Sequence, residues 1–169
     1  MQKEVARIIA LGIAATFVFT AAVASAQDEK VISDEYGVEV SKPKGWEKST
    51  GNEKAVAVFS EPKSQSQIEV VPAKLMTAEV AEVFFNTFHK TLTESSFEKV
   101  GETVPKDVKG IKAQETTYKF THSGVTLKVC VVSFTRDTTA WLVVGYMQDK
   151  EEAKIKPQFD ALLDGMVFK

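Results

Sequence analysis

Cysteine and histidine are scarce in this sequence of 169 residues, and their scarcity excludes several kinds of site. Cys130 is the only cysteine, and His89 and His122 are the only histidines. One cysteine cannot form an internal disulfide, so the domain must be stabilised by its hydrophobic core. A structural zinc site uses about four cysteine or histidine ligands at close spacing, a pattern this chain lacks. We therefore expect no metal site and no cofactor.

An excess of positive charge is also missing. The chain has 21 basic and 23 acidic side chains, a balance that argues against nucleic-acid binding. The sequence contains no Gly-x-Ser-x-Gly, P-loop or His-Glu-x-x-His motif, so we expect no enzymatic activity. Cys130 and His122 would form a nucleophile–base pair only if they were adjacent. The strand register predicted below separates them by about 25 Å, and we interpret Cys130 as a core residue.

The N-terminus has the order of a secretory signal peptide. Lys3 and Arg7 precede an uncharged run over residues 8–23, and Ala24-Ser25-Ala26 is followed by a polar segment. The alternative is a permanent membrane anchor, but the run has 16 residues where a span needs roughly 20. We predict cleavage after Ala26, which leaves no stable membrane span. No cysteine lies near this site, so the protein is not expected to be a lipoprotein.

Cleavage leaves 19 basic and 22 acidic side chains, a net charge of −3. We expect a soluble protein in the periplasm. Residues 27–35 are polar and are predicted to be flexible. Residues 36–169 contain no repeat and no linker, and are predicted to form one domain.

The first half of this domain alternates between two periodicities. Alternating apolar residues predict strands over residues 36–41, 55–60 and 67–71, the last two as a hairpin. Residues 78–94 change to helical spacing, with Thr77 as a plausible N-cap. The apolar positions of this helix are Ala81, Phe84, Phe85, Phe88 and Leu92.

The second half predicts an antiparallel meander. A weak strand over 97–104 precedes strong ones over 111–121, 125–135 and 140–147. The turn pairs Ser123-Gly124 and Asp137-Thr138 join the strong strands. With two-residue turns, the strand pairs are Phe120 with Leu127, Tyr118 with Val129, Phe134 with Trp141, and Cys130 with Gly145.

The middle strand of the meander is apolar on both faces and needs cover on both sides. A last helix lies within residues 150–164. Asp149 and Glu152 resemble a capping box at its start, whereas Pro157 suits the first position of a shorter helix, which we favour. Gly165 ends the helix, and residues 166–168 can add a short strand. The fold class is α+β, with helices packed on a central antiparallel sheet.

Three motifs resemble those of the PsbP-like superfamily, which includes the DcrB-type and LpqN-type exported bacterial proteins. They are the Pro-x-Gly-Trp turn at residues 43–46, the Gly-x-x-Ala element at 110–113, and the Pro-x-Phe-x-x-Leu-Leu-x-x-Met-x-Phe segment at 157–168. The resemblance covers about residues 36–168 and implies an α/β/α sandwich. Relatives are mostly non-enzymatic accessory proteins, and no binding residue of the family maps onto this chain.

We therefore expect a non-catalytic exported accessory protein that binds another envelope protein. Trp46 is a candidate anchor for that partner, although it could equally cap the sheet. Lys106, Lys109 and Lys112 form a basic strip that could meet an acidic partner, or be a solvated loop. The alternative function is a small-molecule or lipid carrier. Its pocket would lie between the helix at 78–94 and the sheet, lined by Phe84, Phe85 and Phe88.

Signal cleavage can be tested on the exported protein. Protein recovered from the cell envelope should have the intact mass of a chain that begins at Gln27. Replacing both Ala24 and Ala26 by Leu should retain the precursor, because signal peptidase requires small residues there. Recovery of full-length protein from unaltered cells would instead support the membrane anchor.

Overall fold

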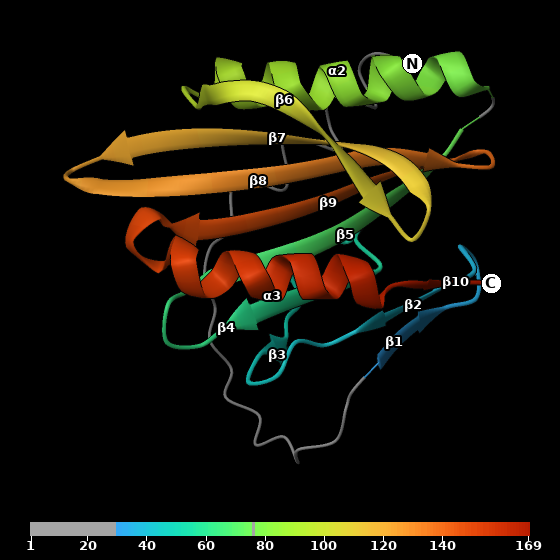
Figure 1. Ribbon diagram of the computed structural model, residues 1–169, viewed down its shortest axis with the longest axis horizontal. Helices are drawn as coiled ribbons and strands as arrows, with labels where there is room; N and C mark the ends of the chain where they lie inside the picture. The colour runs from blue at the N-terminus through green and yellow to red at the C-terminus, as the bar shows by residue number, and fades with distance from the viewer. Residues whose placement is uncertain (1–29, 76) are drawn as a thin grey trace.

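The computed structural model describes residues 30–75 and 77–169, and the predicted signal peptide lies outside them. Within these residues the elements are two α-helices, one 3-10 turn and ten strands, arranged as Figure 1 shows. Their bounds are β1 (Lys30–Ser33), β2 (Val38–Ser41), β3 (Glu47–Lys48), β4 (Ala57–Glu61), β5 (Ser66–Lys74), α2 (Ala78–Glu94), β6 (Glu98–Val108), β7 (Ile111–His122), β8 (Val125–Arg136), β9 (Thr139–Gln148), η1 (Asp149–Glu151), α3 (Glu152–Gly165) and β10 (Val167–Phe168).

The main sheet has seven strands in the order β3-β4-β5-β9-β8-β7-β6, and all neighbours are antiparallel. The predicted hairpin of β4 and β5 and the predicted meander are both confirmed. The four predicted strand pairs also occur, from Phe120 opposite Leu127 to Cys130 opposite Gly145. The tight turns determine this register, because a turn of two residues allows only one alignment of the two strands it joins.

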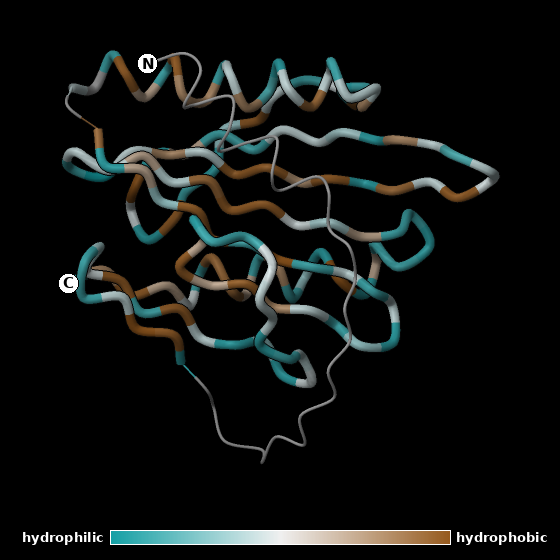
Figure 2. Tube along the Cα trace, turned by 180° about the vertical axis from the view of Figure 1, so that it is seen from behind, coloured by the Kyte–Doolittle hydropathy of each residue, from teal (hydrophilic) through white to brown (hydrophobic). Residues whose placement is uncertain are grey.

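Both faces of the sheet are covered, as the apolar strand β8 required. Val129 and Val131 pack on the α2 side, while Val132 and Phe134 pack on the α3 side, and all four are buried. Figure 2 shows the apolar residues concentrated along the central strands and the hydrophilic ones at the turns. Full burial of one such side chain contributes roughly 1.5–3 kcal/mol, so the two apolar clusters dominate the stability of the domain.

Helix α2 begins and ends at the predicted residues, with Thr77 at the N-cap position. Its side chain makes no capping hydrogen bond to the helix backbone. Phe84 and Leu92 are buried against the sheet, and α2 contacts β6, β8 and β9. No helix in the described parts of the chain has the length and apolar character needed to cross a bilayer.

A second sheet was not foreseen from the sequence. Strands β1, β2 and β10 form three antiparallel strands beside α3, with β2 in the middle. The prediction of a flexible segment over residues 27–35 is therefore wrong for Lys30–Ser33, which pair with Val38–Ser41. The polar composition concealed this strand, whose Val31 packs against the core while Ile32 is exposed. The short terminal strand predicted at residues 166–168 is confirmed as β10.

Helix α3 starts earlier than predicted, because Pro157 lies inside it rather than at its first position. Proline has no amide hydrogen, so one helical hydrogen bond is lost there. Burial of the apolar stripe, Ile155, Phe159, Leu162 and Leu163, maintains the helix across this position. The capping box does not form either: Asp149 and Glu152 both pair with Lys128 of β8 instead.

Helix α3 approaches the sheet most closely at Gly145 of β9. A Cβ atom at this position would lie 2.8 Å from Cδ2 of Phe159. Gly145 therefore makes room for the Phe159 ring, which is fully buried. The glycine is required by packing between layers, and the sequence alone had shown only that it lies opposite Cys130.

Gly145→Ala should lower the free energy of unfolding by about 1–3 kcal/mol, because the added methyl group overpacks the contact with Phe159. Gly165→Ala is the matched control, since no atom lies within 4 Å of a Cβ added there. Denaturant unfolding of both variants tests this contact. Equal stability of Gly145→Ala and the unaltered protein would show that α3 packs less closely than described.

Candidate functional site

The predicted basic strip is divided between two environments. Lys109 and Lys112 are exposed at the turn between β6 and β7, and Lys109 adopts a left-handed backbone conformation. Lys106 is only partly exposed and forms two ion pairs, one with Glu115 of β7 and one with Asp160 of α3. Lys109 and Lys112 alone therefore remain free to meet an acidic partner.

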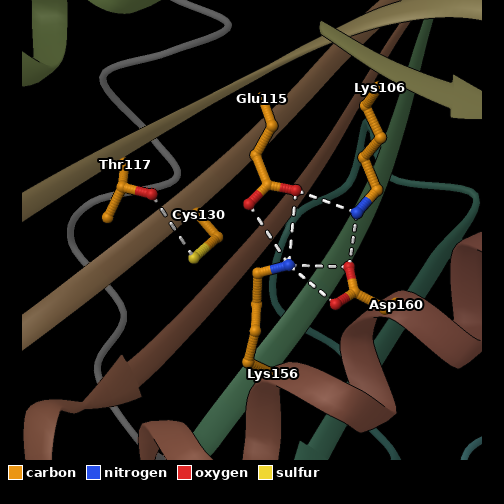
Figure 3. A network of polar contacts seen from close by, with 6 residues as sticks. All are labelled: Lys106, Glu115, Thr117, Cys130, Lys156 and Asp160. Carbon is orange, nitrogen blue, oxygen red and sulfur yellow. Dashed lines mark hydrogen bonds and ion pairs between the residues drawn. The ribbon is translucent and has the colours of Figure 1, made fainter. Parts of the chain in front are cut away.

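Lys106 belongs to a four-charge cluster with Glu115 of β7 and with Lys156 and Asp160 of α3 (Figure 3). Its Nζ lies 2.9 Å from Glu115 Oε2 and 2.6 Å from Asp160 Oδ1. Nζ of Lys156 lies 3.2 Å from Glu115 Oε1 and 2.7 Å from Asp160 Oδ1. The two cations and two anions alternate, so each charge is balanced by two neighbours of opposite sign.

These contacts shift the pKa values of Lys106 and Asp160. Partial burial lowers the pKa of Lys106, but its hydrogen bonds to Asp160 and Glu115 outweigh burial and leave the pKa raised. Burial raises the pKa of Asp160, and hydrogen bonds from Lys106 and Lys156 outweigh it and leave the pKa lowered. The stabilisation from Asp160 is thus complete above its unfolded pKa and is lost as pH falls through its folded pKa. At neutral pH Lys106 is no amine nucleophile and Asp160 no general acid.

Cys130 lies close to the four-charge cluster but is not activated by it (Figure 3). Burial raises the pKa of the thiol to about 11, and the charge of Glu115 adds to this effect. Cys130 lies opposite Thr117, five residues from His122 along β7. Their separation is therefore about 17 Å rather than the expected 25 Å, which still excludes a nucleophile–base pair. Cys130 is a buried core residue, as predicted.

Trp46 is not the exposed anchor that the sequence allowed. Its side chain is 2% exposed, and its indole Nε1 donates a hydrogen bond to Oε1 of Gln158 on α3 at 2.6 Å. The Pro43–Trp46 turn directs the ring into the α3-side core, where the indole ring packs against apolar residues. The burial of Trp46 agrees with the packing role in the alternative interpretation.

The three phenylalanines of α2 have different surroundings. Phe84 is buried, while Phe85 and Phe88 are partly buried against the same apolar cluster. Phe84 lines a hollow of the surface, an open groove at the end of the sheet. Phe85 and Phe88 pack against the apolar cluster on that side of the sheet and are not among the residues that line this groove.

The groove has a volume of about 540 Å³ and is built by four separate segments. These are the turn between β1 and β2, the β3–β4 loop (residues 49–56), the end of β5, and α2. The lining residues are Ser33, Glu35, Tyr36, Glu53, Lys54, Ala55, Val56, Pro72, Ala73, Lys74 and Phe84.

Charges of both signs stand around an apolar floor in this groove. Nζ of Lys74 lies 3.3 Å from Oε1 of Glu35 and 5.2 Å from the centre of the Tyr36 ring. Burial, and then the charge of Glu35, raise the pKa of Tyr36, so its phenol stays protonated at neutral pH. Glu53 and Lys54 add a second acidic and basic pair to the rim. The groove can therefore accept an apolar group flanked by charged ones.

Sequence reasoning missed every groove residue except Phe84. The lining residues lie up to 51 positions apart, from Ser33 to Phe84, and come together only in the folded chain. The Tyr36-Gly37 pair, where Gly37 has a φ of 57°, was the one local signal of a turn there. Among the residues described, no group of three or more His, Cys, Asp or Glu side chains is arranged to hold a metal ion.

Glu115→Gln should lower the free energy of unfolding by about 1–3 kcal/mol, because it leaves Lys106 and Lys156 with one anion between them. Glu98→Gln is the control, since Glu98 pairs with Lys119 at 3.3 Å but is 74% exposed. Its effect should stay within about 0.5 kcal/mol. Urea unfolding of both variants at neutral pH measures the difference, and equal effects would show that the four-charge cluster contributes little.

Comparison with solved structures shows the fold to be PsbP-like. PsbP (CyanoP) from Synechocystis sp. PCC 6803 superposes with a TM-score of 0.65 at 14% identity, covering 90% of this chain and 98% of that one. LpqN, involved in cell envelope biogenesis of Mycobacterium tuberculosis, gives 0.60 at 12%, covering 85% and 91%. PA94 from Pseudomonas aeruginosa, a protein of unknown function, gives 0.52 at 11%, covering 83% and 96%. These likenesses confirm the predicted α+β fold and the resemblance noted from the sequence.

Comparison with curated proteins finds no match. A family model described as the serine/threonine kinase C-terminal domain matches residues 30–166. The match begins at β1 and ends just before β10, so it spans both sheets and both helices. By this match, the chain belongs to the serine/threonine kinase C-terminal domain family and has a PsbP-like fold.

Proposed function

We propose that this protein is a non-catalytic binding domain that is exported and acts as an accessory protein, and that it recognises a segment of another envelope protein in the groove beside Tyr36. The observation that carries the proposal is the groove itself, with its apolar floor and its rim of both charges. The name of the family also supports a recognition role. It describes a domain that follows a kinase, and kinase chemistry belongs to the kinase domain itself.

The chemistry of the reactive side chains supports a binding role over catalysis. The Cys130 thiol is buried with a pKa of about 11, far from the range in which a cysteine acts as a nucleophile. Lys106 and Asp160 neutralise one another within the four-charge cluster. Lys106 and Asp160 stabilise the packing of α3 on the sheet, and their charges are compensated within the fold.

A protein segment suits the groove for electrostatic reasons. The groove is open to solvent along its length, and its rim carries Glu35, Glu53, Lys54 and Lys74. A peptide can place an apolar side chain on Phe84 and charged side chains on the rim. Charges of both signs then select the orientation of the segment more than they increase its affinity.

A small-molecule or lipid carrier is the second candidate. The volume of about 540 Å³ lies within the range of ligand pockets, roughly 300–1,000 Å³. Phe84, which the sequence had assigned to such a pocket, lines it. Native mass spectrometry of protein purified from its host would then show a co-purifying small mass, which Phe84→Ala should reduce.

Site-specific photo-crosslinking in intact host cells tests the proposal. A photoreactive amino acid at Lys54 should give a discrete adduct with one envelope protein, because Lys54 lies on the groove rim. The same residue placed at Lys90, which is 73% exposed on the outer face of α2, is the matched control and should give none.

A third position, Lys109, distinguishes the two surfaces. An adduct from Lys109 without one from Lys54 would place the partner at the basic turn between β6 and β7 and would overturn the proposal for the groove. Equal adducts from all three positions would indicate non-specific collision and would equally contradict it.

A further inference from the structure

One wall of the groove is formed by the β3–β4 loop, which hydrogen bonds hold at both ends and at one residue in its middle. At the ends of the β3–β4 loop, Ser49 N donates to Val58 O at 2.8 Å and Val56 N donates to Val70 O at 2.9 Å. Residues 53–56 line the groove between these ends. The conformation of that wall is therefore set by whatever holds the middle of the loop.

Asn52 is the residue that holds it. Its carbonyl oxygen accepts a hydrogen bond from Ala55 N at 3.0 Å, and its side-chain Oδ1 accepts one from Lys54 N at 3.1 Å. Its Nδ2 reaches the sheet and donates to Oε2 of Glu69 at 2.9 Å. One side chain thus shapes the turn at residues 52–55 and fastens that turn to β5.

Glu69 receives this contact in a buried position. It is 4% exposed, and its other oxygen accepts a hydrogen bond from Nε2 of Gln67 at 2.6 Å. The residues paired with it on the neighbouring strands are Val58 of β4 and Val144 of β9. Tyr146 of β9 is the titratable group that faces it, and burial raises the pKa of that phenol so that it stays neutral.

We propose that Glu69 is a proton-responsive positioning residue that fixes the groove wall when it is ionised and releases it when it is protonated. An ionised carboxylate accepts from both amides, whereas a protonated one must donate through one oxygen. Gln67 can turn its amide to accept that proton. Asn52 then donates to the remaining oxygen of a neutral carboxyl group, so this hydrogen bond loses its charge-assisted strength and the loop is held less firmly.

The surroundings of Glu69 shift this change to a higher pH than in the unfolded chain. Burial raises the pKa of Glu69, and the hydrogen bonds from Asn52 and Gln67 offset only part of the effect. Because the folded pKa lies above the unfolded one, the ionised form destabilises the fold. The contribution of Glu69 to global stability therefore increases as pH falls through its folded pKa, while the loop is released. General acid unfolding would instead lower both the global stability and the protection of the loop amides as pH falls.

Amide hydrogen exchange of the mature protein, followed by NMR and corrected for intrinsic rates, tests this inference. As pH falls through the titration of the Glu69 carboxyl carbon, protection of Lys54 N and Ala55 N should drop about fivefold to tenfold. Val56 N, bonded to Val70 O, should keep its protection. In Glu69→Gln, protection of both loop amides should be low at every pH.

Glu61→Gln is the matched control. Glu61 is also a buried acid, with Oε2 accepting from Ser64 N at 2.6 Å, but it lies at the far end of β4. It should leave the pH profile of Lys54 and Ala55 unchanged. If Glu69→Gln does not fold, Asn52→Ala should give low, pH-independent protection of Ala55 N, whose acceptor is the backbone carbonyl of residue 52 and is kept in the variant.

Unchanged protection of Lys54 and Ala55 while Glu69 titrates would overturn the inference, as would a Glu69→Gln profile equal to that of the unaltered protein. The inference deepens the proposed function, because it concerns control of the same groove. Its measurement follows the loop and needs no partner, so it can fail while the crosslinking experiment succeeds, and the reverse.

Discussion

Strands β8 and β9 carry apolar side chains on both faces, and the domain must therefore cover its sheet twice. Helix α2 covers one face with Phe84 and Leu92. Helix α3 and the second sheet cover the other, with Phe159 and Val40. Removing either cover would expose a row of fully buried valines, each contributing roughly 1.5–3 kcal/mol. The order of the elements along the chain, strands then helix, twice over, is what this constraint requires.

Because both faces of the sheet are covered, the places where charged and polar side chains can lie are restricted. Charges inside the covered region must be paired or hydrogen-bonded, and the four-charge cluster shows how pairing is achieved where β6 and β7 meet α3. Open surface with apolar character remains at the end of the sheet, where the turn between β1 and β2 and the β3–β4 loop stand apart from α2. The groove formed there is bounded by loops, which can vary in sequence without disturbing the core.

The sequence predicted the parts of the fold that local rules determine. Two-residue turns set the register of the meander, so Phe134 was placed opposite Trp141 without knowledge of the tertiary structure. Helical spacing set the bounds of α2 for the same reason. Pro157 misled the prediction of α3, because burial of Ile155 and Phe159 overrides the lost backbone hydrogen bond.

The parts that depend on contacts between distant segments were not predictable in this way. Whether Trp46 was buried or exposed depended on Gln158, which lies 112 residues away. Strand β1 lies in a polar segment of the sequence and is held by pairing with β2. The groove residues, apart from Phe84, carry no common motif and meet only in the folded protein. Of the basic strip, Lys109 and Lys112 are exposed as expected, whereas Lys106 is held by Glu115 and Asp160.

Cys130 offers the most direct measurement of the sealed sheet, because it is the only thiol and lies in the middle of β8. The native protein should resist a thiol reagent at neutral pH and should react only at the rate at which the whole domain unfolds. Addition of denaturant should then release one reactive thiol. Rapid reaction of the native protein, at the rate of an exposed cysteine, would show that the sheet is open at its centre and would contradict the account.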